Sequence, residues 1–435
     1  MSNTQKRLPM WTLAAWALST VFASPAAWAA AGDPLGPEMR VDSGAGSGVG
    51  QISGVARDGV GDVVVVWERT GSAAPGVYAR LYAPGGTPKG AEFAVPLADG
   101  YPAVAMDSAG DFVVTSSSFN TQKLTYSIQA QRYHASGAPN GAAIAVASYA
   151  KLGEFVDIAP APVAMDAGGD FVVVWNQATA TELGAESSLV DLSVNTNAIH
   201  ARRYAASGTA KGAAFLVAAD LPDVAPLSGP LQSSLPVVAV DADGALVSAW
   251  INFKLESNTV EFKRYDLNGK AQDLVQHANT SSMKLPSNVA VGSDAAGNFT
   301  IAWAELDGVP GTPDYIWARR YSSSGAALGS TFALGTSSSA VFQSPAIGMQ
   351  PDGDFVVAWG QLGQVDGSAL IEAQRCSSGG VLQGTNFQVN SIAPGYQRQP
   401  GVAMDGYGDF AVVWAQGAEL GNGYDGVYLR LYSGQ

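Results

Sequence analysis

The sequence "PVAMDAGGDFVVVW" (162–175), followed after a variable segment by "IHARRYAASGTAKGAAFLV" (199–217), decides the fold. It contains four strand-sized apolar pieces joined by glycine-containing turns, and similar units recur along the chain. Asp166 has a counterpart about every 58 residues, at what we call the marker position. The marker positions are Asp58, Asp107, Asp166, Asp241, Asp294, Gln350 and Asp405. Seven units of four strands predict an all-β protein, a seven-bladed β-propeller of four-stranded blades.

The two ends of the chain share one unit. In most units the fourth strand follows a Gly-x-x-x-Gly pattern that begins four residues after a tyrosine, or after Cys376 in one unit. At the front, Gly32 and Gly36 introduce such a strand without a preceding tyrosine, whereas Tyr432 is followed by only three residues. Pairing the first strand with the last blade removes an open sheet edge. We therefore expect residues 32–41 to be the closing strand of the last blade, in a single domain that spans 32–435.

The second strand of most units is apolar at every position, which indicates a strand buried on both faces. Its tryptophan is expected to pack between blades, with a series of sugar-stacking rings as the alternative. These tryptophans are Trp67, Trp175, Trp250, Trp303, Trp359 and Trp414. Cys376 is the only cysteine and occupies a tyrosine position, so we expect a buried core residue and no internal disulfide, with a reactive thiol as the alternative.

Arginines recur at one depth of the third strand. They are Arg80, Arg202, Arg319 and Arg430. We expect them to pair with the acidic turns or to lie on outer strands, and a shared anion site is the alternative.

The turn between the first and second strands often reads Asp-x-x-Gly-Asp, as at 166–170. An aspartate that caps the turn and a glycine with positive φ suit a tight hairpin. A calcium loop is the alternative, although calcium needs six to eight oxygen ligands and these turns are short. The nearest approaches are Asp241 with Asp243, and Asp352 with Asp354. We expect no cofactor. Bound calcium stays open as the alternative, and no residues are assigned to a metal site.

The first 31 residues have the features of a signal peptide. Lys6 and Arg7 precede an apolar stretch, and small residues follow around 27–31. Its removal leaves 21 basic residues against 37 acidic ones, a net charge of −16. This charge disfavours nucleic acid and anionic lipid as partners. We expect an exported monomer, periplasmic or extracellular, with no membrane span after cleavage.

Loop lengths divide between the two faces of the expected disc. The first-to-second and third-to-fourth turns keep their length, whereas the other connections vary, and in a meander all of these lie on the opposite face. Binding residues often lie on variable loops carried by a rigid scaffold. The residues there that could bind a ligand are aromatic, amide or charged: Tyr101, Phe155, Asp314, Phe342, Gln343, Tyr396, Gln397, Arg398 and Asp425. The alternative is that the aromatic rings fill gaps between blades.

The sequence predicts no catalytic residue. His134, His200 and His277 fall in different units without the spacing of metal ligands, and no nucleophile elbow or phosphate-binding loop is present. Carboxylate pairs from different blades stay open, because spacing in the sequence does not reveal them.

The consensus of "PxVAMD", "GDFVVVW", "ARRY" and "GxxxGxxFxV" resembles repeats of bacterial exported proteins, including large haemolysin-type and adhesin-like chains. The resemblance covers almost the whole chain after residue 31 and implies export and an extracellular or surface binding role. It carries no catalytic residue.

These observations favour an exported, non-enzymatic binding module that recognises a glycan or a protein through the variable-loop face. Two alternatives stay open. One is a carbohydrate-active hydrolase or lyase with acidic residues in the central funnel, and the other is a structural protein of the envelope or cell surface.

Overall fold

The computed structural model describes residues 32–434, except for several internal segments. These segments are 44–48, 71–73, 98–99, 121, 124, 151–159, 181–193, 222–234, 253–257, 280–284, 307–311, 364–368, 392–395 and 418–425. The predicted signal peptide, 1–31, lies outside the described residues. Within the described part of the chain, no helix has the length and apolar character needed to cross a membrane.

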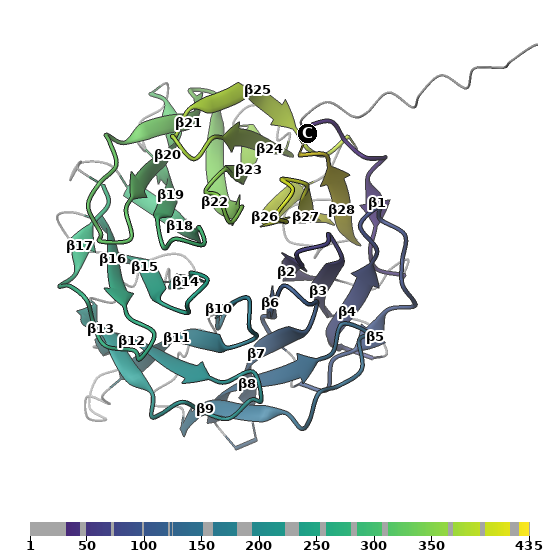
Figure 1. Cartoon of the computed structure of the whole chain (residues 1–435), viewed down its shortest axis with the longest axis vertical. Coiled ribbons are helices and arrows are strands. Elements are labelled where there is room, and N and C mark those ends of the chain that lie inside the picture. Colours follow the sequence, from purple (N-terminus) through teal and green to yellow (C-terminus); the bar gives the residue numbers. More distant parts are fainter. Residues whose placement is uncertain are drawn as a thin grey trace, which may run out of the picture.

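The described residues form seven antiparallel sheets of four strands, arranged as a ring of blades (Figure 1). Blade 1 comprises β2 (Val49–Arg57), β3 (Val63–Arg69), β4 (Gly76–Tyr82) and β5 (Phe93–Ala94). Blade 2 comprises β6 (Ala103–Met106), β7 (Phe112–Asn120), β8 (Thr125–Tyr133) and β9 (Ile144–Ala150). Blade 3 comprises β10 (Val163–Met165), β11 (Phe171–Ala180), β12 (Val194–Tyr204) and β13 (Phe215–Leu221). Blade 4 comprises β14 (Val237–Val240), β15 (Leu246–Asn252), β16 (Thr259–Tyr265) and β17 (Gln276–His277).

Blade 5 comprises β18 (Leu285–Ser293), β19 (Phe299–Leu306), β20 (Asp314–Tyr321) and β21 (Phe332–Ser337). Blade 6 comprises β22 (Ala340–Met349), β23 (Phe355–Gly363), β24 (Ala369–Cys376) and β25 (Leu382–Gln388). Blade 7 comprises β26 (Tyr396–Met404), β27 (Phe410–Gly417), β28 (Gly426–Tyr432) and β1 (Met39–Arg40). The first strand of each blade lies nearest the central axis (Figure 1). The predicted seven-bladed β-propeller is confirmed.

The closing blade joins the two ends of the chain, as predicted. In β1, Met39 pairs with Leu429 and Arg40 with Tyr428. Backbone hydrogen bonds extend this contact on both sides, from Leu35 N to Leu431 O and from Val41 N to Val427 O, each 2.8 Å long. The front strand therefore leaves no open edge on β28.

The second strands form the core between blades. All six predicted tryptophans are buried, which confirms their packing role. Five of the seven second strands also start with a phenylalanine. In four of these blades the phenylalanine ring stacks on the tyrosine that ends the third strand, and the rings of Phe410 and Tyr432 lie 4.7 Å apart. Cys376 takes the tyrosine position opposite Phe355. It is buried as predicted, and burial raises the pKa of its thiol to about 12.

The marker turns are built as predicted. Asp166 Oδ1 accepts hydrogen bonds from the backbone N–H groups of Gly168 and Asp170, at 2.9 and 3.0 Å, while Gly169 has a φ of +87°. The glycine also lies against the marker aspartate of the preceding blade: a Cβ on Gly169 would meet Asp107 Oδ2 at 3.1 Å. The position therefore requires glycine both for its backbone angle and for close contact between blades.

The recurring third-strand arginines also join neighbouring blades. Arg80 Nη1 donates to Val41 O of blade 7 at 3.0 Å, and Arg430 Nη1 donates to Val389 O of blade 6 at 2.6 Å. Arg202 and Arg319 bond in the same way, so the partner is a backbone carbonyl rather than the expected acidic turn. These arginines are structural and form no shared anion site.

Candidate functional site

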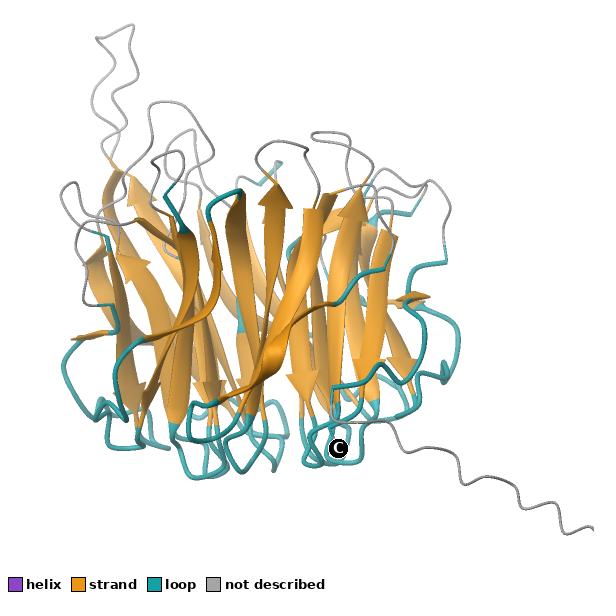
Figure 2. Ribbon diagram, turned by 90° about the horizontal axis from the view of Figure 1, so that it is seen from above, coloured by secondary structure: helices purple, strands orange, loops and turns teal. Residues whose placement is uncertain are grey.

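The disc has two unlike faces. The turns between first and second strands, and between third and fourth strands, gather on one face, along the lower edge of Figure 2. We call this the tight-turn face. The opposite ends of the strands form the other face, which we call the variable-loop face and where the sequence predicted a binding site.

The predicted residues of the variable-loop face are in different environments. Phe155 and Asp425 lie outside the described residues, as does the side chain of Tyr396. Phe342 is buried, and its ring packs edge-on against Trp359 with 6.1 Å between centroids. Its ring therefore fills a gap in the blade, so its prediction as a ligand-stacking surface is wrong in this structure.

Gln397 and Asp314 are also buried, with 2% and 5% exposure, so neither offers its side chain to solvent as a ligand contact requires. Burial of both corrects the prediction that they line an open surface. Tyr101, Gln343 and Arg398 are half-buried. Among the predicted residues, these three keep the accessibility that a binding role needs.

Gln343 and Arg398 belong to a larger set that the structure brings out. Both lie seven residues before a marker position, on β22 and β26. Blade 5 has a polar pair at the equivalent place on β18. We call the six residues the polar arc: Ser287, Asn288, Gln343, Ser344, Arg398 and Gln399. The first strands lie nearest the central axis, so the polar arc runs part of the way around this axis, over the three successive blades 5, 6 and 7 (Figure 1).

The backbone of the polar arc is strained. Ser344 and Gln399, six residues before their markers, have φ of +48° and +52°, the only positive values of non-glycine residues in the described part of the chain. Each precedes a proline, and each lies at a break in the register between first and second strands. Such bulges re-aim side chains, and strained backbone of this kind clusters at functional sites.

The arc is continuous from blade to blade. Ser344 N lies 3.4 Å from Asn288 Oδ1, which connects blades 6 and 5. A Cβ on Gly360 would lie 3.6 Å from Gln343 O and 3.8 Å from Gln397 O, so the first strands of blades 6 and 7 meet at this glycine. Among the described residues, Ser287 Oγ and Gln399 Oε1 are buried atoms without a hydrogen-bond partner.

A pocket of about 320 Å³ lies on the axis at the tight-turn face, lined by residues next to the markers. Its walls include four methionines at one repeat position, one residue before the marker: Met106, Met165, Met349 and Met404. The marker aspartates around it cap their own turns, as Asp107 does through the N–H groups of Ala109 and Asp111. These aspartates therefore have a role in turn formation, and burial raises the pKa of the carboxyls of Asp107, Asp241 and Asp405.

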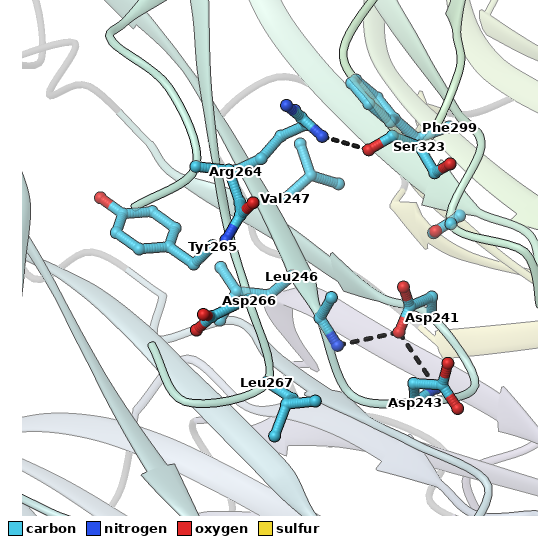
Figure 3. A pocket seen from close by; sticks show the side chains of 14 residues that line it. Asp241, Asp243, Leu246, Val247, Arg264, Tyr265, Asp266, Leu267, Phe299 and Ser323 are labelled. Atoms are coloured by element: carbon cyan, nitrogen blue, oxygen red, sulfur yellow. Dashed lines mark hydrogen bonds between the residues drawn. The ribbon is translucent and has the colours of Figure 1, made fainter. Parts of the chain in front are cut away.

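A second pocket, of about 230 Å³, lies between blades 4 and 5 on the same face (Figure 3). Asp241 and Asp243 lie on one side of it, and Asp266 and Leu267 on the other. Arg264 crosses its end, where Nη1 donates to Ser323 O. The sequence points to Asp241 and Asp243 only as a near approach to a calcium loop and does not predict a pocket, although the blade 4 turn, "DADGA", departs from the repeat.

Two carboxylates of the variable-loop half accept hydrogen bonds from indole groups. Glu261 Oε2 accepts the indole N–H of Trp250 at 3.0 Å, and Glu305 Oε1 accepts that of Trp317 at 3.1 Å. Burial raises the pKa of Glu372, which lies opposite Trp359 on the neighbouring strand. No three His, Cys, Asp or Glu side chains of the described residues are arranged to hold a metal ion.

Comparison with solved structures supports the fold. A protein of unknown function from Dyadobacter fermentans matches with a TM-score of 0.50 and 9% identity over 91% of this chain and 98% of its own. A polysaccharide lyase matches with a TM-score of 0.48 and 10% identity, over 94% of this chain and 92% of its own. An α-L-arabinofuranosidase from Fusarium graminearum matches with a TM-score of 0.45 and 10% identity, over 92% of this chain and 98% of its own. At such identities the likeness concerns the propeller fold alone. No family model and no curated protein matches the chain.

Proposed function

We propose that the protein is an exported propeller that binds a glycan through the polar arc on its variable-loop side. Glycan recognition is what the lectin-like and the carbohydrate-active hypotheses share. The observation that carries the proposal is the pair of left-handed residues, Ser344 and Gln399, at one repeat position of adjacent blades. Two strained, proline-flanked positions in register are costly to retain without a function.

The chemistry of the arc suits a neutral polyhydroxyl ligand. Hydroxyl and amide side chains both donate and accept hydrogen bonds, as sugar hydroxyls do. Arg398 adds the one cationic side chain, whose planar guanidinium can bind two oxygens at once. Ligand sites typically combine a few such converging polar groups with apolar walls.

A binding role is preferred to catalysis because the polar arc contains no carboxylate. Glycoside hydrolysis ordinarily needs an acid and a second carboxylate on opposite sides of the bond. Glu261 and Glu305, the carboxylates with indole partners, have structural roles in their blades. A hydrolase or lyase remains the runner-up and is an outcome of the test.

A glycan array of the mature protein, run with calcium and again with chelator, tests the proposal. The double variant Gln343→Ala/Arg398→Ala should bind its glycan at least about tenfold more weakly, because two or more hydrogen bonds are lost. Tyr407→Ser, an exposed site on the tight-turn face, is the matched control and should bind as the parent does. Unchanged binding by the double variant would exclude the arc as the site. Release of reducing ends or unsaturated products from the bound glycan would instead establish the enzyme.

The resemblance of the repeats to those of bacterial exported proteins supports the proposal that the protein acts outside the cytoplasm. Fractionation of the native host, with detection of the processed N-terminus, tests that part separately. Retention of the full-length chain inside the cell would contradict it.

A further inference from the structure

The pocket between blades 4 and 5 exists because blade 4 lacks a side chain that most other blades supply. The last residue of the marker turn is an aspartate or asparagine in six blades and Ala245 in blade 4. In five of the six, its Oδ1 accepts the N–H of the residue two positions after the end of the third strand. The donors are Ala135 at 2.9 Å, Ala206 at 2.8 Å, Ser323 at 3.2 Å, Ser378 at 2.6 Å and Gly434 at 2.7 Å. In blade 1 the donor position is Pro84, which has no N–H.

The equivalent donor in blade 4 is the N–H of Leu267. Ala245 has no side-chain oxygen to accept this hydrogen bond. Blades 1 and 3 also place a lysine beside the aspartate, in the pairs Lys89 with Asp62 and Lys211 with Asp170. Blade 4 has Gln272 at the lysine position. In blade 4, Ala245 and Gln272 therefore replace the aspartate and the lysine of this ion pair, and both line the pocket of about 230 Å³.

The rim of this pocket offers acceptors as well as donors. Asp266 is acidic at a position where five of the other six blades have alanine or serine, and Asp243 has an acidic counterpart only in Asp352 of blade 6. Asp241 lies beside them, and burial raises the pKa of its carboxyl. Arg264 closes one side, held by Asp273 at 2.7 Å and by Ser323 O. Leu246 and Phe299 line the apolar part.

These groups decide between three kinds of ligand. An anion would take the place of the missing carboxylate, but it would face three aspartates without the lysine that accompanies two of the other blades. A cation would meet the aspartates, but also Arg264 and an N–H donor at the vacant position. A hydroxyl group both donates and accepts, so it can satisfy Leu267 N and the carboxylates together. A neutral polyol suits the mixed rim best.

We propose that this pocket binds one sugar ring of a neutral saccharide, as a second site on the face opposite the polar arc. Its volume is below the range of about 300–1,000 Å³ of typical small-molecule sites, which limits it to a single ring. The two sites share no residue, so either one can exist without the other.

Saturation-transfer NMR on the mature protein tests the proposal, with D-glucose, D-galactose, D-mannose and L-arabinose as probes at about 10 mM, suited to millimolar affinity. The variant Ala245→Asp/Gln272→Lys restores the pair of blades 1 and 3 and should fill the pocket. We expect at least one sugar to bind the parent, and this variant to weaken that binding about tenfold or more. Lys211→Gln, which leaves the pocket untouched, is the matched control and should bind as the parent does.

The competing ligand classes are tested with acetate and methylammonium. Saturable binding of either ion at the pocket, without any sugar, would overturn the proposal, as would sugar binding that survives when the filled variant also carries Gln343→Ala/Arg398→Ala. The absence of binding by all four sugars would overturn it as well. The arc variant Gln343→Ala/Arg398→Ala separates the sites: sugar binding at the pocket should persist in it even if glycan binding at the arc is lost.

Discussion

Arg57 and Asp405 form a buried ion pair across the seam where the ring closes. Arg57 Nη2 lies 3.0 Å from Asp405 Oδ2, and the two side chains are 0% and 2% exposed. Asp409 adds a second carboxylate at 3.6 Å. Arg57 occupies the position before the marker, which four other blades fill with methionine. Blade 1 therefore contacts blade 7 through a charge where most other neighbouring blades meet through apolar side chains.

This pair predicts an unequal response to removing its members. Arg57→Met recreates the arrangement of blades 2 and 3, in which a methionine lies beside a marker aspartate, so it should cost less than about 1.5 kcal/mol. Asp405→Asn keeps the turn cap but leaves Arg57 buried with only the more distant Asp409, and should cost about 3 kcal/mol. Urea unfolding followed by tryptophan fluorescence measures both. The double variant should recover most of the loss, and equal costs for the two single variants would contradict this account.

The closing strand predicts that stability depends on the first residues of the domain. A chain that starts at Asp42 loses burial of Met39 and Val41 and the backbone bonds of β1, worth together about 5 kcal/mol or more. A chain that starts at Gly32 is the control. Thermal unfolding should show a clearly lower midpoint for the shorter chain, still in one transition. The same midpoint for both chains would refute closure by the front strand as a source of stability.

Two aspartates predict opposite pH dependence. Burial raises the pKa of Asp107, and nearby Asp111 adds to this. A carboxyl whose pKa is raised on folding favours the folded state below its unfolded pKa, near 3.8, and this contribution is lost as the pH rises through the folded pKa. Asp107→Asn should therefore be most favourable relative to the parent at neutral pH, and this advantage should shrink towards pH 3.

Asp170 provides the opposite case. Burial acts to raise its pKa, but the bonds from Lys211 and Ala206 outweigh it, and the pKa is lowered. Its contribution is present above about pH 4 and is lost as the pH falls through the folded pKa. Asp170→Asn should cost stability at neutral pH, and the cost should fade in acid. Urea midpoints of both variants between pH 3 and 7 measure this, and parallel curves would show that neither shift matters for folding.

The sequence was sufficient for the fold because every blade repeats the same local signals. The Asp-x-x-Gly-Asp turns, the apolar second strands and the unpaired strand after Gly32 each specify a contact that the structure contains. The candidate site was harder to predict. Phe342 reads as an exposed aromatic but packs on Trp359, because β22 begins earlier than the repeat implies. The bulges at Ser344 and Gln399 arise from register with β23 and β27, which composition does not reveal.

The strained residues of the polar arc predict an inverted preference between alanine and glycine. At ordinary positions alanine stabilises more than glycine, because glycine loses more backbone freedom on folding. At Ser344 and Gln399 the positive φ penalises every side chain, so Ser344→Gly should be more stable than Ser344→Ala by about 1 kcal/mol, and likewise at Gln399. Val60, an exposed residue whose φ is not positive, is the control, where alanine should be the better replacement. Urea midpoints of the paired variants measure the difference.

If the strain serves ligand binding, both glycine variants should also bind the glycan more weakly than the parent, while they fold at least as stably as their alanine counterparts. A glycine variant that binds the glycan as the parent does would show that the strained backbone does not contribute to binding.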